Sequence, residues 1–246
     1  MILFKLSKDL IKKIINTTLV IHIFRRELSK MTTIEDCVTL AYTFHDKIKV
    51  LPPRMRWHFA IFPAQMKEEI IQLLEKIVLL KPKALLEIGT ANGGTLFLFC
   101  RVATPETLIV SMDLPGGRFG GGYPEWKIPL FRSFALTQKI FLLQVNSHDS
   151  TTLEKMKEIL KEQKIDFLFI DGDHTYEGVR KDFQMYGSLV RKGGIIAFHD
   201  IVPGPPENVG GVPQFWHEIK NAKNYKCSEI VSDWDQEGCG IGVIYV

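Results

Sequence analysis

The chain has 246 residues, enough for one substantial domain with an appendage and too few for two independent domains of ordinary size. Hydrophobic residues make up 46% and charged residues 24%, which excludes a disordered or fibrous chain. The net charge of +3 arises from 31 basic and 28 acidic residues spread along the chain, so we expect no nucleic-acid partner.

The first thirty residues are rich in basic side chains set among Ile, Leu and Phe. An apolar run at 14–24 is too short and too polar to span a bilayer, and no small-residue cleavage site follows it. We expect a packing helix, with a basic amphipathic helix on a membrane or partner as the alternative. The four cysteines form no Cys-x-x-Cys pair, which is typical of a cytoplasmic protein.

Residues 34–62 mix short apolar stretches with Pro52 and Pro53, a pattern that favours an irregular, partly helical cap. From 65 to 80 the apolar residues recur at helical spacing, which predicts an amphipathic helix. We therefore expect a helical N-terminal extension at 1–64 and the main domain at 65–246.

Five apolar segments bounded by turns follow, and helical patterns at 150–164 and 177–189 lie between some of them. The segments are 84–88, 107–112, 139–145, 167–170 and 194–198. Strands alternating with helices predict a parallel sheet. Segments 227–233 and 240–246 have no helix between them, which predicts a terminal antiparallel hairpin. The expected fold class is α/β, a mostly parallel seven-stranded sheet with helices on both faces.

A glycine-rich loop follows the segment 84–88, where Glu87, Gly89 and Gly93 have the spacing Glu-x-Gly-x-x-x-Gly. Glycines at this point let a ligand approach the backbone and the free amides of the next helix. The dinucleotide spacing Gly-x-Gly-x-x-Gly is absent, since position 91 is alanine. Asp113 ends the next strand, where a carboxylate can bind ribose hydroxyls. Taken singly, these features also occur as a chain reversal and a helix cap.

In their order and spacing these residues resemble the class I S-adenosylmethionine-dependent methyltransferases, a Rossmann-like family, over residues 65–246. The chain is most similar to the branch with catechol-type, cephalosporin-type and macrolide-sugar O-methyltransferases. The resemblance implies that the loop holds the methionine part of the cofactor and that Asp113 holds the ribose. Ser147-His148-Asp149 resembles a Ser-Gln-Asp stretch near the adenine, with His148 in place of glutamine. The expected cofactor residues are Glu87, Gly89, Asn92, Gly93, Asp113, Ser147, His148 and Asp171.

Polar residues follow two of the later strands, where Asp171 comes after 167–170 and His199-Asp200 after 194–198. Side chains at the carboxyl ends of adjacent strands converge, and two carboxylates with an imidazole suit Mg2+ or another divalent cation. We expect a metal site of Asp171, His199 and Asp200 that orients an alcohol and favours its deprotonation. In the related metal-dependent enzymes an acid or amide stands where this chain has His199.

The third residue beyond Asp171 is His174. In the resembling families this position is the general base, a lysine in the catechol type and a histidine in the macrolide-sugar type. An imidazole titrates near neutrality and can take the proton of an attacking hydroxyl. The alternative is a loop or capping residue, and for His199-Asp200 a turn at the strand end. Asp173 either orients His174 or is a solvated turn acid.

Two glycine- and proline-rich loops, at 114–123 and 203–212, are candidates to cover the acceptor pocket. Their alternative is ordinary surface connection. Phe215 and Trp216, which open the following helix, are candidates for substrate contact or for core packing.

We expect an O-methyltransferase that acts on a small hydroxylated molecule, such as a sugar or natural product. A nicotinamide-dependent oxidoreductase shares the strand, glycine turn and distal acid, but its glycine spacing differs. A non-catalytic scaffold with the same fold is a second alternative, against which Asp171, His174 and Asp200 argue. No motif for a flipped base is present, and the oligomeric state, including a homo-oligomer, stays open.

Overall fold

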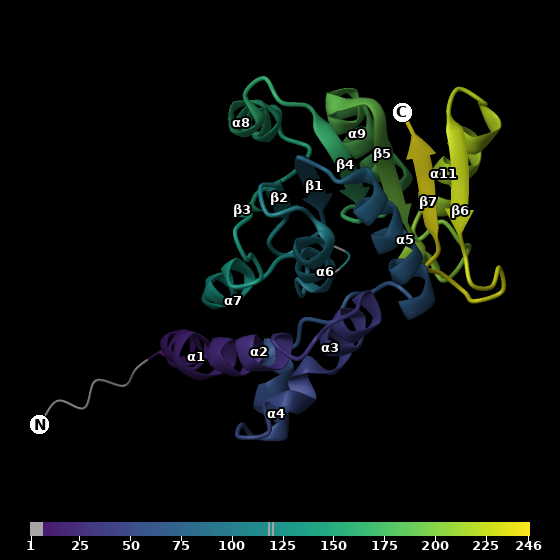
Figure 1. The fold of residues 1–246 in the computed structure, drawn as a ribbon. Helices are drawn as coiled ribbons and strands as arrows, with labels where there is room; N and C mark the ends of the chain where they lie inside the picture. Colours follow the sequence, from purple (N-terminus) through teal and green to yellow (C-terminus); the bar gives the residue numbers. More distant parts are fainter. Residues whose placement is uncertain (1–6, 118, 120) are drawn as a thin grey trace, which may run out of the picture.

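The computed structural model describes residues 7–117, 119 and 121–246, and its centre is a seven-stranded sheet (Figure 1). The strand order is β3-β2-β1-β4-β5-β7-β6. The strands are β1 (Ala84–Ile88), β2 (Leu108–Asp113), β3 (Lys139–Gln144), β4 (Ile165–Ile170), β5 (Val190–His199), β6 (Lys226–Ile230) and β7 (Ile241–Tyr245). The five strands from β1 to β5 are parallel, and β7 runs antiparallel between β5 and β6. The predicted fold class and terminal hairpin are confirmed.

The burial of each strand follows its place in the sheet. Every residue of β1 and β4, which lie in the middle, is buried, whereas the edge strands β3 and β6 are mostly half-buried. Central parallel strands need cover on both faces and therefore consist of continuous apolar runs. This is why the runs at 84–88 and 167–170 are visible in the sequence.

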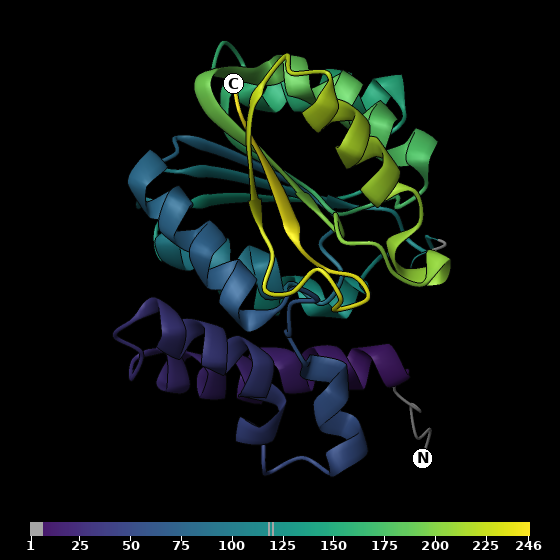
Figure 2. The ribbon, with the colours of Figure 1, turned by 90° about the vertical axis from the view of Figure 1, so that its right-hand side faces the viewer.

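Helices cover both faces of the sheet (Figure 2). The first face packs against α8 (Ser150–Leu160), α9 (Tyr176–Tyr186) and α11 (Val212–Asn221). The second face packs against α5 (Lys67–Leu80), α6 (Gly94–Val102) and α7 (Ile128–Arg132), of which α7 follows the short 3-10 helix η3 (Glu125–Lys127). The helix predicted at 177–189 is shorter, because the 3-10 turn η4 (Gly187–Leu189) leads straight into β5.

The N-terminal helices form a further layer beyond α5 and α6 (Figures 1 and 2). They are α1 (Lys8–Ile15), η1 (Asn16–Val20), α2 (Ile21–Leu28), α3 (Ile34–Lys47), α4 (Pro53–Arg56) and the 3-10 turn η2 (Trp57–Phe59). Phe24 is fully buried, and its ring lies 5.2 to 5.3 Å from those of Phe44, Phe97 and Phe134. The predicted packing role therefore holds for α2, while the boundary at residue 65 stays a prediction.

No helix in the described part of the chain has the length and apolar character needed to cross a membrane. The apolar run at 14–24 lies in consecutive short helical segments, and Val20 and Phe24 on it are buried in the core. The polar Asn16 is also buried, where its side-chain amide donates to the Trp126 carbonyl at 2.6 Å. This hydrogen bond satisfies the amide nitrogen, whereas the buried amide oxygen has no hydrogen-bond partner among the described residues.

Candidate functional site: a cavity at the carboxyl ends of the parallel strands

The strand register brings the predicted residues to one edge of the sheet. Ile88 is paired with Ile170, and Ile170 with Phe198, so that the residues after β1, β4 and β5 are neighbours. The strand order changes direction between β1 and β4, where ligands of open α/β sheets bind. At this point Gly89 has a φ of +103°, and a Cβ there would lie 1.9 Å from the backbone oxygen of Asp171. Only glycine allows this close approach of the two loops.

A cavity of about 280 Å3 opens at this edge. One part of its wall comes from the loops after β1, β2 and β3, and another from the loop after β4. Six residues expected to bind cofactor or to act in catalysis line it together: Gly89, Asp113, Ser147, His148, Asp171 and His174. The structure therefore joins both predicted groups in one space.

Glu87 lies outside the cavity walls formed by the described residues, although we expected it to hold the methionine part of the cofactor. It is fully buried beneath the glycine loop, where the hydroxyls of Thr95 and Ser111 donate to its carboxylate. Burial raises the pKa of Glu87 to about 8, although these two hydrogen bonds lower it. The side chain supports the loop from below.

Asn92 and Gly93 also lie outside the cavity walls formed by the described residues, and both shape the loop. The amide oxygen of Asn92 accepts a hydrogen bond from the buried Lys127 at 3.0 Å. Gly93 precedes α6 with a φ of +80°, and a Cβ there would lie 2.5 Å from the ring of Phe131. The glycine is required because the loop turns over an aromatic ring.

Asp113 reaches the cavity from the end of β2. One oxygen of its carboxylate accepts a hydrogen bond from the Ala91 amide at 2.6 Å, which fixes the acid to the glycine loop. Burial raises the pKa of Asp113, and hydrogen bonds from backbone amides oppose that shift. The carboxylate is thus held at the cavity wall, where it can accept hydrogen bonds from hydroxyl groups of a ligand.

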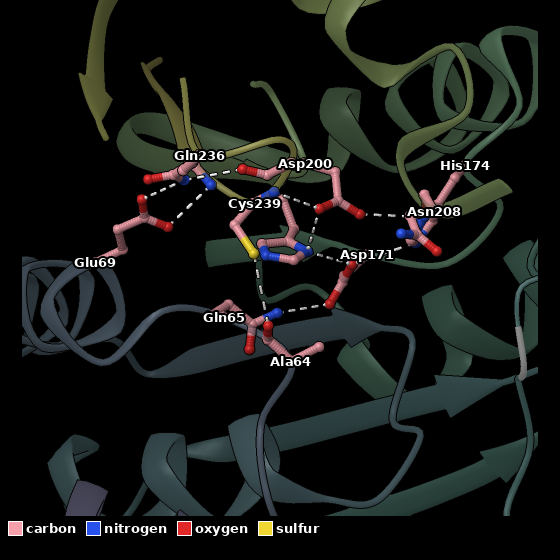
Figure 3. A network of polar contacts seen from close by, with 12 residues as sticks. Ala64, Gln65, Glu69, Asp171, His174, Asp200, Asn208, Gln236 and Cys239 are labelled. Atoms are coloured by element: carbon pink, nitrogen blue, oxygen red, sulfur yellow. Dashed lines mark hydrogen bonds and ion pairs between the residues drawn. The ribbon is translucent and has the colours of Figure 1, made fainter. Parts of the chain in front are cut away.

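Beside the cavity, two imidazoles lie between two carboxylates (Figure 3). His199 Nδ1 lies 3.1 Å from Asp171 Oδ1 and 3.3 Å from Asp200 Oδ1. His174 Nε2 lies 3.4 Å from Asp171 Oδ1, and its Nδ1 lies 3.2 Å from Asp200 Oδ2. Asp171, His199 and Asp200 therefore converge as the sequence predicts, and His174 joins them.

The electrostatics of this cluster favour charged imidazoles. Burial lowers the pKa of His174, but hydrogen bonding to Asp171 and the charges of Asp171 and Asp200 outweigh it and raise the pKa to about 9. The pKa of His199 likewise rises well above its ordinary value against the effect of burial. Burial raises the pKa of Asp171, but the charge of His199 and the contacts with His174 bring it below its usual range. Opposite charges inside a protein stabilise one another in this way.

His174 is oriented by groups other than its neighbour Asp173. Its Nδ1 donates to the Asn208 carbonyl at 2.6 Å, and the ring of Phe119 stacks on it with centroids 4.8 Å apart. Asp173 instead accepts from the Thr175 amide at 2.9 Å. The suggestion that Asp173 orients His174 is therefore wrong, because Asp173 acts as a turn acid before α9.

Two sets of donors at this cluster are close enough to share a metal ion. One ligand atom each from Asp171, His174 and Asp200 lie within 4.8 Å of one another, and the same holds for His199, Asp200 and Cys239. The predicted set of Asp171, His199 and Asp200 differs from both, since His199 Nδ1 forms ion pairs with the two acids. Asp200 is common to both sets.

Some residues at the site carry no signal in the sequence. Gln65, just before α5, donates to Asp171 Oδ2 at 2.8 Å, and the Cys239 amide donates to Asp200 Oδ1 at 3.0 Å (Figure 3). Glu69 anchors the loop that carries Cys239 by accepting hydrogen bonds from the Gln236 side chain and the Gly240 amide. Gln65 and Glu69 are separated from these partners by 106 or more residues in the chain, so only the folded structure reveals the contacts.

The first of the two expected cover loops borders the cavity. Gly117, Phe119 and Gly121 line it, while positions 118 and 120 of the same loop are outside the described residues. A cover that stacks on His174 limits the access of water to it. The motion expected of this loop stays a prediction.

The second loop contains the short helix α10 (Pro206–Val209), which brings the Asn208 carbonyl to His174. Its end is fixed by the Gly211 amide, which donates to the His174 carbonyl at 2.7 Å. Phe215 and Trp216 of α11 are buried, and both rings pack against Phe198 of β5. Core packing is therefore their role.

Comparison with known proteins gives a family match and a shared fold. Residues 86–201 match a family described as a methyltransferase domain. The protein y4gI of Sinorhizobium fredii is 25% identical over 144 residues, which cover 57% of this chain and 15% of that protein. The chain thus spans about 15% of the length of this curated relative.

Solved structures of two O-methyltransferases share the fold. TomG from Streptomyces achromogenes, which is involved in tomaymycin synthesis and was crystallised with S-adenosylmethionine, has a TM-score of 0.58 at 16% identity over 85% of this chain and 89% of its own. The Bacillus cereus enzyme, crystallised with S-adenosylhomocysteine, has a TM-score of 0.55 at 15% identity over 96% and 97%. Residues 86–201 therefore match a methyltransferase domain, and the chain shares its Rossmann-like fold and sheet order with these two O-methyltransferases.

Proposed function

We propose that the protein transfers a methyl group from S-adenosylmethionine to a hydroxyl oxygen of a small molecule, such as a sugar or natural product. One observation carries this proposal: a single cavity is lined by the ribose-type acid Asp113 and by the imidazole His174. An acid that binds a nucleoside and a base that activates an acceptor are the two groups that the reaction needs in one space. TomG and the Bacillus cereus enzyme, which share the fold, are named as O-methyltransferases.

In this proposal the cofactor lies across the carboxyl ends of β1, β2 and β3. Asp113 binds the ribose, Gly89 lies beside the methionine part, and Ser147 and His148 border the base. Glu87, Asn92 and Gly93 act indirectly, by holding the glycine loop in the shape that the cofactor meets. The free amides at the start of α6 add a favourable dipole for a carboxylate.

His174 is the proposed general base. Its Nδ1 is hydrogen-bonded to the Asn208 carbonyl, so Nε2 is the nitrogen that accepts the proton of the acceptor hydroxyl as its oxygen attacks the methyl carbon. Asp171 and Asp200 would stabilise the imidazolium that results, and the raised pKa of His174 in the free protein supports this role. Because this pKa is raised, the resting imidazole carries an additional proton. That proton has to leave before Nε2 can accept the proton of the acceptor hydroxyl.

A divalent cation is the proposed auxiliary of this site. The donors fit such an ion, since two carboxylates face each other and His199 Nε2 is buried with no hydrogen-bond partner among the described residues. Asp200 would hold the ion, either with Asp171 and His174 or with His199 and Cys239. When bound, the ion would favour the ionised form of the acceptor hydroxyl.

Calorimetric titration tests the proposal. The wild type is titrated with S-adenosylmethionine, S-adenosylhomocysteine and NAD, with and without Mg2+ or Mn2+, beside Asp113→Ala and Asp171→Ala. The exposed loop acid Asp235 provides a matched control, Asp235→Ala. We expect the adenosyl ligands to bind to the wild type and control but not to Asp113→Ala, and a metal effect to disappear in Asp171→Ala. Binding of NAD alone, or of no ligand, would refute the assignment.

A further inference from the structure

A fully buried acid lies behind the cavity wall. Asp182 on α9 has no exposed surface, and neither oxygen of its carboxylate has a hydrogen-bond donor among the described residues. Its ion-pair partner is His148, whose Nε2 lies 3.3 Å from Asp182 Oδ1. A buried carboxylate is costly unless a cation compensates it, and here an imidazole is placed to do so.

The imidazole of His148 forms part of the cavity wall beside Ser147. Its Nε2 is buried against Asp182, which leaves Nδ1 as the ring nitrogen available to a ligand in the cavity. Two hydrogen bonds fix the loop that follows β3 and carries His148. The His148 amide donates to the Asn146 side chain at 2.9 Å, and the Tyr186 hydroxyl donates to the Ser147 carbonyl at 2.7 Å. Asp182 and Tyr186 are one helical turn apart on α9, so one helix positions both the ring and its loop.

We propose that Asp182 is a positioning residue that holds His148 as an Nδ1–H donor to a ring nitrogen of the cofactor's base. This inference rests on the proposed function, which places the base at His148. A protonated imidazole has no acceptor, so it selects a base that offers a lone pair. The glutamine of the catechol-type enzymes, in contrast, presents both a donor and an acceptor.

The charges around His148 agree with this role. The close contact with Asp182 raises the pKa of His148, burial lowers it, and the charges of Asp182 and Asp173 raise it further against Lys181. Asp182 and Lys181 belong to α9, and Asp173 to the loop before it. When pH rises through this pKa, the proton next to Asp182 stays and the one on Nδ1 leaves. The donor is then lost, so affinity for the base should fall with rising pH.

The test compares ligands that differ by one ring nitrogen or by the amino group of the base. The wild type, His148→Phe and Asp182→Asn are each titrated with S-adenosylhomocysteine. The same titrations are made with its 1-deaza, 3-deaza and 7-deaza analogues and with its inosine analogue. Glu177→Gln, an exposed acid on the same helix, is the matched control. Melting temperatures establish that each variant is folded.

We expect one deaza analogue to bind about tenfold more weakly than the parent to the wild type and control, as for loss of a charged hydrogen bond, but equally to His148→Phe. In Asp182→Asn the pH at which affinity falls should shift downward, which a purely structural role would not produce. The inference is overturned if no deaza analogue differs from the parent, if only the inosine analogue does, or if the Asp182→Asn pH profile matches the wild type. Failure of the parent ligand to bind at all would instead refute the proposed function.

Discussion

Glu87→Gln removes an ionisable carboxyl group that the fold keeps uncharged beneath the glycine loop. Burial raises the pKa of Glu87 from 4.5 to about 8. Between these two pH values the folded chain therefore holds a proton that the unfolded chain has released, so stability must fall as pH rises. Each pKa unit corresponds to about 1.4 kcal/mol, so the total loss is about 5 kcal/mol once the pH exceeds 8. Glutamine keeps the shape of the side chain but cannot ionise.

The assay is urea unfolding of the wild type and Glu87→Gln at a series of pH values from about 5 to about 8. We expect the free energy of unfolding of the wild type to fall relative to the variant across this window, with the variant more stable at its upper end. Thr95 and Ser111 contact different oxygens of Glu87, so in the variant one hydroxyl can donate to the amide oxygen and the other can accept from the amide nitrogen, and the variant should fold. Parallel pH dependences for the two proteins would refute the reasoning, because Glu87 would then be ionised in the fold.

Three further substitutions test other parts of the account. Phe24→Ala should lower the free energy of unfolding by about 3 to 5 kcal/mol in urea titrations, because the ring is fully buried among three other rings; a loss below about 1 kcal/mol would contradict this packing. Gly89→Ala should weaken S-adenosylhomocysteine binding at least about tenfold by calorimetry, since its Cβ would meet the Asp171 backbone; unchanged affinity would refute the close approach. His174→Gln should slow methyl transfer to a hydroxyl acceptor about 10²- to 10⁴-fold in a labelled-methyl assay with little change in cofactor affinity, and an unchanged rate would exclude it as the base.

The parallel sheet could be predicted because its strands are buried on both faces and therefore appear as uninterrupted apolar runs. The positions of Asp113, Asp171 and His199 followed, since Asp113 and His199 end strands and Asp171 directly follows one at the same edge. The position of β7 between β5 and β6 could not be predicted, because a hairpin's pattern does not say which of its strands joins the sheet. The pattern at 1–30 predicted a packing helix, but it did not show which elements Phe24 packs against, because Phe44, Phe97 and Phe134 are remote in sequence.

Within the site, the glycine spacing indicated the loop but not the direction of its side chains. Glu87 alternates with Leu86 and Ile88 along β1, which places it on the α6 side of the sheet, away from the cavity. The partners of Asp171 and His148 are remote in sequence, as Gln65 and Asp182 show, and no local pattern marks them. Side-chain direction and long-range pairing are properties of the packed chain.

The crystal structure of the complex with S-adenosylhomocysteine is the most direct test of the central claim. We predict the ligand in the cavity at the carboxyl ends of β1, β2 and β3, with its ribose hydroxyls on Asp113, its base beside His148 and its sulfur facing His174. A ligand bound elsewhere, or bound here with the sulfur directed away from His174, would contradict the account.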